Sequence, residues 1–218
     1  MQPISLLNNI VIYGQSPKFI NAIKDIYPNA QIHVLPWRAS ELAAKALVSQ
    51  INTPIDLLLI CGYDYGSYSH PKNLYLNQNV YRIINICKMI TNAGEKMVYI
   101  DTLDSKKHHT YSRYLYAKKL LGQQLKLSFP KAKILAIPTI FDKQHQIGMQ
   151  GGLLSQVAAK LLIESGRIQT MNLEQLKAKL KSTIEFGNSN ASTSSIQPIL
   201  IGVPRPQFID RALRILLG

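Results

Sequence analysis

The sequence has little that would place it outside the ordinary globular proteins. No apolar run reaches the roughly 18 residues that cross a membrane, so we expect no membrane span. The opening residues MQPISLLNNIVIYG lack a basic segment followed by a cleavage site, and we therefore expect a cytoplasmic protein. Only two cysteines occur, Cys61 and Cys87, and both lie in apolar segments. This favours buried free thiols and leaves no evident disulfide or metal site.

Acidic residues are also scarce. The chain has 12 Asp and Glu against 25 Lys and Arg, which gives a net charge of +13. The excess is concentrated between Thr102 and Lys133, where only Asp104 is acidic. Such a charge attracts polyanions, including nucleotide cofactors, sugar nucleotides, nucleic acid and anionic lipid. No nucleic-acid-binding signature accompanies it, so we do not expect a nucleic-acid partner, and a generically basic surface is the alternative.

Short apolar runs alternate with amphipathic segments along the chain. We expect strands at 9–13, 31–37, 54–61, 96–101 and 132–138, and helices at 17–27, 40–51, 77–92 and 111–128. Beyond residue 142 we expect helices at 152–165 and 172–186, a mobile polar loop at 187–197, a strand at 198–204 and a helix at 206–217. The alternation predicts one α/β domain over residues 1–218, built on a Rossmann-like, doubly wound parallel sheet.

In such sheets, ligands bind beyond the carboxyl ends of the strands. Those ends are predicted at Gly14, Trp37–Arg38, Cys61–Gly62, Asp101–Thr102 and Pro138–Thr139. The helix predicted at 111–128 follows the strand that ends at Thr102. Its first turns therefore belong to the same edge of the fold.

Tyr114 and Lys118 lie four residues apart in this helix, which puts both side chains on one face. An ammonium beside a phenol favours the phenolate and lowers its pKa from about 10, which suits the tyrosine to general acid or base chemistry. The same spacing recurs at Tyr68 and Lys72, but Pro71 disfavours a shared helix there. The surroundings of Tyr114 therefore carry more weight than the spacing.

The order of these segments resembles the short-chain dehydrogenase/reductase family over nearly the whole chain. The similar segments are Gly14 after the first strand, PIDLLLICGY, the run from Asn79 to Asn85, VYIDT with Thr102 at its end, Tyr114 twelve residues later, and Pro138-Thr139. The resemblance implies an NAD(P)-dependent oxidoreductase that transfers a hydride at a hydroxyl or carbonyl of a small substrate. The basic surface leaves an anionic or nucleotide-linked substrate open.

The resemblance also implies roles for single residues. Tyr114 would transfer a proton to or from the substrate oxygen, and Lys118 would lower its pKa and bind the nicotinamide ribose. Thr102 would orient the substrate oxygen, and Asn79 would hold a water of the proton relay. Residues implied in cofactor binding are Gly14, Gln15, Ser16, Lys18, Arg38, Cys61, Gly62, Lys118, Pro138 and Thr139. The helices at 77–92 and 111–128 would form a homodimer.

Arg38 stands at the end of the second strand, where an acidic residue would receive the ribose 2′-hydroxyl of NAD. We therefore expect NADP to be favoured. The turn after the first strand reads Gly14-Gln15-Ser16-Pro17-Lys18-Phe19-Ile20 and keeps only the first glycine of the family's pattern. Pro17 removes a backbone N–H that would face phosphate, while Lys18 supplies a charge.

The altered turn supports a second hypothesis, a binding or scaffolding protein with this fold that no longer uses a dinucleotide. A third is a basic protein that binds nucleic acid or a membrane surface. Each site residue also has a purely structural interpretation. Tyr114 would be a half-buried aromatic, Lys118 a solvated cation, Thr102 a strand cap, Asn79 an ordinary helix residue and Arg38 a surface cation.

Overall fold

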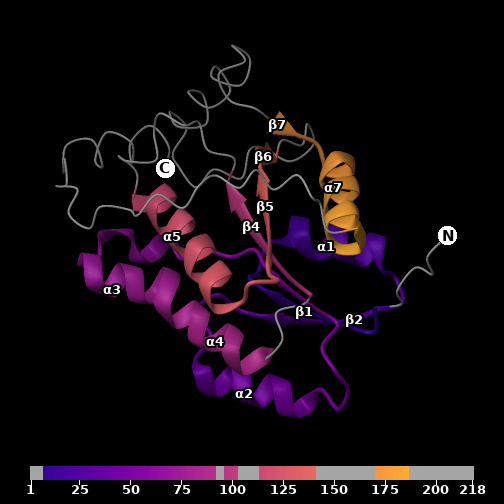
Figure 1. Cartoon of the computed structure of the whole chain (residues 1–218), viewed down its shortest axis with the longest axis horizontal. Coiled ribbons are helices and arrows are strands. Elements are labelled where there is room, and N and C mark those ends of the chain that lie inside the picture. The colour runs from indigo at the N-terminus through magenta and orange to yellow at the C-terminus, as the bar shows by residue number, and fades with distance from the viewer. Residues whose placement is uncertain (1–6, 92–95, 103–112, 141–169, 187–218) are drawn as a thin grey trace.

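A computed structural model describes residues 7–91, 96–102, 113–140 and 170–186 (Figure 1). The expected helix at 152–165, the loop at 187–197, the strand at 198–204 and the helix at 206–217 lie outside these ranges. Within the described residues, no helix is long and apolar enough to cross a membrane.

Five parallel strands form the centre of the molecule. They are β1 (Asn9–Tyr13), β2 (Gln31–Leu35), β3 (Leu57–Ile60), β4 (Met97–Thr102) and β5 (Lys133–Ile137). Their order in the sheet is β2-β1-β3-β4-β5, and every pairing is parallel. This confirms the predicted Rossmann-like parallel sheet. A separate small sheet pairs β6 (Thr139–Ile140) with β7 (Thr170–Met171).

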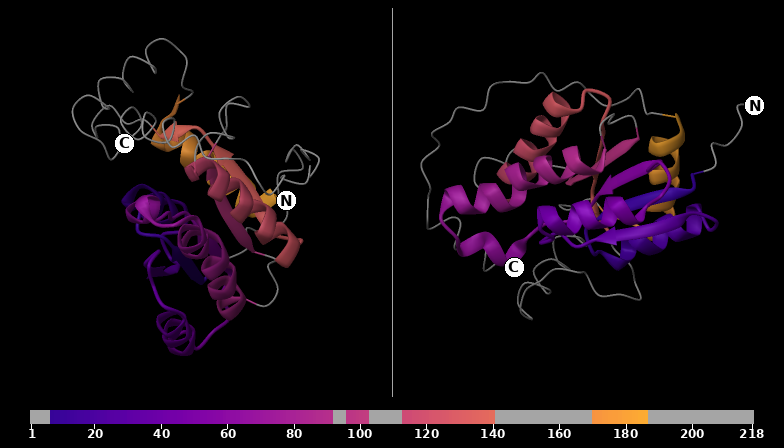
Figure 2. Two further views of the ribbon diagram at one scale, coloured as in Figure 1. Left: turned by 90° about the vertical axis from the view of Figure 1, so that its left-hand side faces the viewer. Right: turned by 90° about the horizontal axis from the view of Figure 1, so that it is seen from below.

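Helices cover both faces of the sheet. The longer ones are α1 (Pro17–Ile26), α2 (Glu41–Gln50), α4 (Arg82–Ile90), α5 (Arg113–Ser128) and α7 (Leu173–Phe186). Side chains of α1 and α7 share one hydrophobic cluster with the sheet, and those of α2, α4 and α5 share the other. Figure 2 gives two further views of these layers. The chain therefore changes face between β2 and β3.

Local sequence explains several of the element boundaries. Pro17 opens α1, where its missing N–H costs nothing. The Ser40 hydroxyl caps α2 by accepting a hydrogen bond from the Ala43 N–H at 3.1 Å. β2 ends at Leu35 rather than at residue 37 because Pro36 cannot donate a ladder hydrogen bond.

The helix predicted to begin near residue 77 begins earlier. α3 (Lys72–Leu76) follows the extended Pro71 and continues through a π-helical turn (Asn77–Tyr81) into α4. A 3₁₀ turn (Tyr65–Ser69) precedes Pro71, so Tyr68 and Lys72 do not share one helix. The start at 77 was wrong because Pro71, which excludes a helix before it, is well suited to begin one after it.

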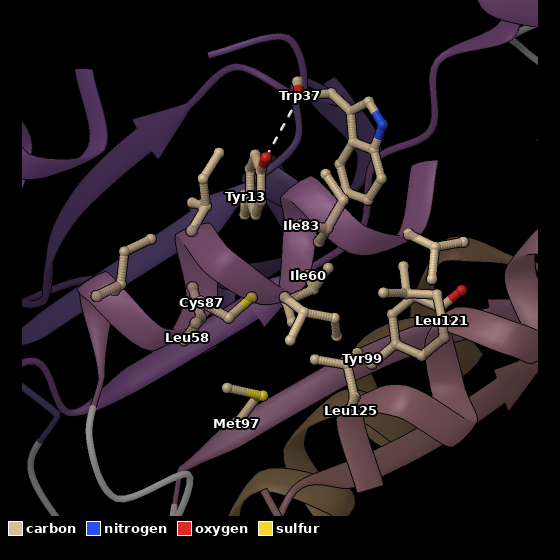
Figure 3. Packing of buried hydrophobic residues seen from close by; sticks show 14 of the residues in the cluster. Tyr13, Trp37, Leu58, Ile60, Ile83, Cys87, Met97, Tyr99, Leu121 and Leu125 are labelled. Carbon is tan, nitrogen blue, oxygen red and sulfur yellow. Dashed lines mark hydrogen bonds between the residues drawn. The ribbon is translucent and has the colours of Figure 1, made fainter. Parts of the chain in front are cut away.

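The core consists of the two clusters on either side of the sheet. β1 and β3 are buried along their whole length, as their largely apolar sequences predict. Figure 3 shows part of the cluster beneath α4 and α5, where Ile83 and Cys87 pack near Leu58 and Ile60. Ile83 and Cys87 are fully buried, which confirms Cys87 as a core thiol and assigns this face of α4 to packing within the chain.

Candidate active site

Thr102 and Tyr114 meet at the carboxyl end of β4. Thr102 is the last residue of the strand, and Tyr114 lies in the first turn of α5. The Thr102 Oγ1 and Tyr114 Oη atoms are 2.8 Å apart, the distance of a short hydroxyl–hydroxyl hydrogen bond. Two residues twelve positions apart are thus brought together with both oxygens at the sheet edge where ligands bind in this type of sheet.

Lys118 follows Tyr114 by one turn of α5 and is buried. Its Nζ atom donates a hydrogen bond to the Ile100 carbonyl at 2.6 Å and lies 4.7 Å from the centre of the Tyr99 ring. Burial lowers the pKa of Lys118 to about 8, although nearby Asp101 acts in the opposite direction. An amine of this kind is much easier to deprotonate than a surface lysine.

Two residues to which the sequence analysis gave no role, Tyr63 and Asp101, contact Tyr114 and Thr102. The Tyr63 ring, just beyond β3, packs edge-on against the Tyr114 ring with centroids 4.6 Å apart. Asp101 is buried, and its carboxylate accepts a hydrogen bond from the Thr102 N–H at 2.8 Å. The sequence features that could have indicated Tyr63 and Asp101 are an aromatic residue directly after Gly62 and an acidic residue directly before Thr102, both at strand ends.

The turn after β1 begins at Gly14, whose φ of +137° is a conformation that side chains rarely allow. Ser16 precedes α1 but makes no side-chain capping bond there. The Lys18 ammonium reaches the Ile140 carbonyl of β6 at 3.4 Å. Lys18 therefore lies beside the Pro138–Thr139 segment, as expected if both belong to one site. Gln15 lies in the same turn.

Arg38 reaches from the end of β2 to the residues after β3. Its guanidinium is 2.6 Å from the Asp64 carboxylate, which is buried, while the Arg38 side chain is 68% exposed. The carboxylate also accepts a hydrogen bond from the Gly66 N–H at 3.0 Å. Arg38 keeps free donors toward solvent, but its charge is already partnered by an acid that the sequence did not link to it.

Trp37 lies over the end of β3. A Cβ atom built on Gly62 would collide with the Trp37 ring, so the indole rests directly on this glycine. The indole N–H donates to the Asn79 Oδ1 at 3.3 Å, and the ring centre is 5.0 Å from that of Tyr13. Trp37 is only 5% exposed.

Asn79 is fully engaged with other protein groups. Its Oδ1 accepts hydrogen bonds from the Trp37 indole N–H and the Asp64 N–H. Its Nδ2 donates to the Ser67 hydroxyl and the Tyr75 carbonyl. Both amide hydrogens and both lone pairs are used, which leaves none for a water. The Asn79 side chain therefore links Trp37, the residues after β3 and Tyr75 in this arrangement, and the water-holding role that the resemblance implies stays a prediction.

Cys61 lies at the same edge, where desolvation raises the pKa of its thiol to about 12. Cys61 is only partly buried, and a raised pKa disfavours the thiolate form. Among the described residues, no group of three or more His, Cys, Asp or Glu side chains could hold a metal ion.

No protein-family model and no curated protein matches this sequence. Solved structures do match it. One is a dTDP-4-dehydrorhamnose reductase from Bacillus anthracis in complex with NADP, at 13% identity and a TM-score of 0.57, covering 83% of this chain and 71% of that one. Another is a short-chain dehydrogenase/reductase superfamily protein from Agrobacterium tumefaciens with bound NAD, at 9% identity and a TM-score of 0.57, covering 83% and 74%. A third is the ADP-L-glycero-D-manno-heptose-6-epimerase of Helicobacter pylori, at 12% identity and a TM-score of 0.56, covering 83% and 75%.

The chain has the fold of the short-chain dehydrogenases/reductases. At these identities the likeness establishes the architecture, and the chemistry has to be argued from the site. In a short-chain dehydrogenase/reductase fold, a dinucleotide lies across the carboxyl ends of the strands, with its pyrophosphate at the start of the first helix.

The residues of this chain fit such a group unevenly. Toward β4, the hydroxyls of Thr102 and Tyr114 and the amine of Lys118 have the chemistry needed beside a nicotinamide. At the turn, Gly14 permits close backbone approach and Lys18 supplies a positive charge. Toward β2, by contrast, the Trp37 indole already covers Gly62. The residues near β4 therefore suit the nicotinamide half of a dinucleotide, whereas the Trp37 indole occupies space on the side of the adenosine half.

Proposed function

We propose that this protein is an NAD(P)-dependent oxidoreductase that interconverts a hydroxyl and a carbonyl on a small substrate. The observation that carries the proposal is the 2.8 Å contact between the hydroxyls of Thr102 and Tyr114, with Lys118 buried one turn further along α5. A nicotinamide, when bound, supplies or accepts the hydride. The three side chains supply the proton and the binding of the reacting oxygen.

Tyr114 is the proton donor when a carbonyl is reduced. Its phenol gives its proton to the substrate oxygen as negative charge develops there, which is general acid catalysis. The Thr102 hydroxyl donates a second hydrogen bond to that oxygen and orients it beside Tyr114. The positive charge of Lys118 stabilises the phenolate left behind. Since the pKa of Lys118 is about 8, this charge is largely present at neutral pH.

The cofactor would be held by residues from four strand ends. The Gly14-Gln15-Ser16 turn and Lys18 would contact the pyrophosphate, and Cys61–Gly62 and Pro138–Thr139 would flank the cofactor. Arg38 favours NADP, because a guanidinium pairs with a 2′-phosphate through charge-assisted hydrogen bonds. The bound NADP and NAD of the structural neighbours support a nicotinamide dinucleotide in general.

A nucleotide-linked substrate is the class we favour. Two of the structural neighbours carry a dTDP or ADP group in the names of their substrates. The basic stretch between Thr102 and Lys133, with Tyr114 and Lys118 inside it, would attract the diphosphate of such a substrate.

The second candidate is a binding protein that has kept the fold and lost the dinucleotide. Trp37 over Gly62 and Pro17 at the start of α1 favour it. It predicts no affinity for NADPH or NADH and no effect of changing Tyr114. Homodimerisation through the helices at about 77–92 and 111–128 is compatible with either function and stays a prediction.

The deciding experiment is a calorimetric titration of the purified protein with NADPH and NADH. Reduction of a panel of keto-sugar nucleotides, followed by nicotinamide absorbance, comes next. We expect micromolar binding of NADPH and turnover that Tyr114→Phe lowers by at least about 100-fold while the nearby Tyr116→Phe retains it. No binding of either cofactor at millimolar concentration to the folded protein would reject the oxidoreductase in favour of the binding protein.

A further inference from the structure

The strand order fixes one point of the sheet where a ligand is expected. From β1 the chain crosses to β2 by α1 on one face, and from β2 to β3 by α2 on the other. The connections therefore diverge between β1 and β3, and the space beyond the ends of these two neighbouring strands is the switch point of the fold. Gly14 and Gly62 follow the two strands.

In this chain the switch point is filled from within. The two glycine backbones are so close that a Cβ atom on Gly14 would lie 2.7 Å from the Gly62 nitrogen. The Trp37 indole then lies on Gly62 and bonds to Asn79 on the helical side. With 5% of its surface exposed, Trp37 is packed like a core residue although it lies in the connection after β2.

Arg38 makes a second contact between the end of β2 and the segment after β3. It reaches from the β2 end to Asp64, two residues beyond Gly62, just as Trp37 reaches to Gly62 itself. Adjacent residues at the end of β2 thus hold the segment after β3 by an aromatic contact and an ion pair. We call Trp37 and Arg38, with Gly62 and Asp64, the β2–β3 latch.

The latch lies on the adenosine side of the proposed cofactor. In dinucleotide-binding sheets the residue at the end of the second strand contacts the adenosine ribose, so the base lies near Trp37 and Arg38. The nicotinamide side lies at Thr102 and Tyr114, beyond β4. An indole and a purine are flat aromatic bicycles of similar size, and both offer a face for stacking and a ring N–H or N for hydrogen bonding.

We propose that the Trp37 indole occupies the place of the adenine base, so that a dinucleotide binds only when the β2–β3 latch opens. This rests on the proposed function for the identity of the ligand. The hydrogen bond that holds the indole suits displacement, because the Trp37 N–H bond to Asn79 is long at 3.3 Å.

Because the latch has to open before an adenosine ligand can bind, it lowers the apparent affinity for any such ligand. When the binding-competent state is a small fraction of the molecules, the apparent dissociation constant rises by the inverse of that fraction. A latch that is open in about one molecule in a hundred weakens binding about 100-fold. Ligands that contact only the Thr102 side are not affected.

The test uses the fact that Trp37 is the single tryptophan of the chain, so its emission reports the latch alone. Wild-type protein is titrated with adenosine 2′,5′-bisphosphate and, separately, with reduced nicotinamide mononucleotide. We expect the adenosine probe to shift the Trp37 emission to longer wavelength as the indole meets water. The nicotinamide probe should leave the wavelength unchanged.

Calorimetry on variants gives the second readout. Trp37→Ala should bind adenosine 2′,5′-bisphosphate at least 10-fold more tightly than wild type. Phe129→Ala removes a similarly buried aromatic from the same cluster, after α5 and far from the strand carboxyl ends, and should leave the affinity unchanged. Trp37→Phe, with a smaller ring, should show a smaller gain and serves if Trp37→Ala does not fold.

The outcomes separate the latch from the proposed function. Probe binding to wild type without a change in emission, or a folded Trp37 variant that binds no tighter than wild type, overturns the latch and leaves the oxidoreductase untouched. A Trp37→Ala protein that gains adenosine binding but neither binds reduced nicotinamide mononucleotide nor reduces any substrate retains the latch and rejects the oxidoreductase.

Discussion

At the scale of a single residue, the hydrogen bond between Thr102 and Tyr114 is the clearest indication of chemistry. We expect Tyr114→Phe to lower kcat by about 10²- to 10⁴-fold, the range for loss of a general acid, with little change in KM. The melting temperature should stay within a few degrees of wild type, because only one hydroxyl is removed. Steady-state kinetics and thermal unfolding measure the two effects.

Tyr116→Phe is the matched control. It lies two residues further in α5, and its ring faces the Lys72 ammonium at 5.8 Å rather than Thr102. An equal loss of kcat in both variants would show that the phenols support α5 and do not transfer a proton.

Lys118 gives a prediction about stability and pH. Its pKa is about 8 in the folded protein against 10.5 in the unfolded chain, so between these values the unfolded chain holds more protons and stability rises with pH. Below pH 8 the folded protein carries a buried charge at a cost on the order of 3 kcal/mol. Lys118→Met should therefore be more stable than wild type at pH 7, and the difference should fade above pH 10. Chemical denaturation across this range measures it, and a constant difference would contradict the pKa.

Arg38 and Asp64 determine how much positive charge faces a 2′-phosphate. Asp64→Asn keeps the shape of the side chain and removes the charge that partners Arg38. We expect the ratio of NADPH to NADH affinity to rise by about 2- to 5-fold, because the exposed Arg38 guanidinium then has no acidic partner in Asp64, and Arg38→Ala to reduce it. Binding titrations with both cofactors decide, and a ratio that neither variant changes would place the 2′-phosphate elsewhere.

The sequence predicted residues whose position depends on local order. Thr102 at a strand end and Tyr114 in the next helix follow from the regular alternation of elements. The contact between Trp37 and Asn79 does not follow from this alternation. A hydrogen bond between residues 42 positions apart depends on how the connection after β2 packs over the end of β3. The resemblance implies a water at Asn79, and the sequence pattern did not indicate that the Trp37 indole N–H bonds to its side chain.

At the scale of elements, the turn after β1 packs tightly against the segment after β3. Gly14→Ala would place a Cβ atom 2.7 Å from the Gly62 nitrogen, at a φ of +137°. We expect a loss of about 1–3 kcal/mol of unfolding free energy, because neither backbone has room to move. Equilibrium urea denaturation measures the loss.

Gly122→Ala is the opposite case. Gly122 lies inside α5, and the nearest atom to an added Cβ is a flexible Ile134 methyl at 3.4 Å. An alanine there should stabilise the protein by about 0.5–1 kcal/mol through helix propensity. If both variants lost a similar amount of unfolding free energy, the loss at Gly14 could not be attributed to its positive φ.

Most strands and helices were predictable because their apolar periodicity is strong. β1 and α1 match their expected bounds within one residue. The strand predicted at 54–61 spans only Leu57–Ile60, and two other errors occur at prolines. Pro36 ends β2 early, and Pro71 begins the helical run earlier than the pattern from Val80 onward suggested. A proline lacks a backbone N–H, so it can end the element before it and still begin the element after it. The sequence pattern does not show which of the two it does.

At the scale of the whole molecule, the net charge of +13 opposes compaction. We expect the melting temperature at pH 7 to rise by several degrees as sodium chloride increases from low to physiological concentration, because screening weakens the repulsion. Sucrose at equal osmolarity is the control for general effects of solutes. A melting temperature that falls with salt would mean that ion pairs such as Arg38–Asp64 outweigh the repulsion.

The strand order also has a consequence for how the chain acquires its structure during synthesis. After β1 and β2 have paired, β3 adds beside β1, β4 beside β3 and β5 beside β4. Each new strand joins the same growing side of the sheet, and none has to enter between two strands already paired. The sheet can thus be assembled in the order in which the ribosome releases its strands, with β1 hydrogen-bonded on one side before its second partner has been translated.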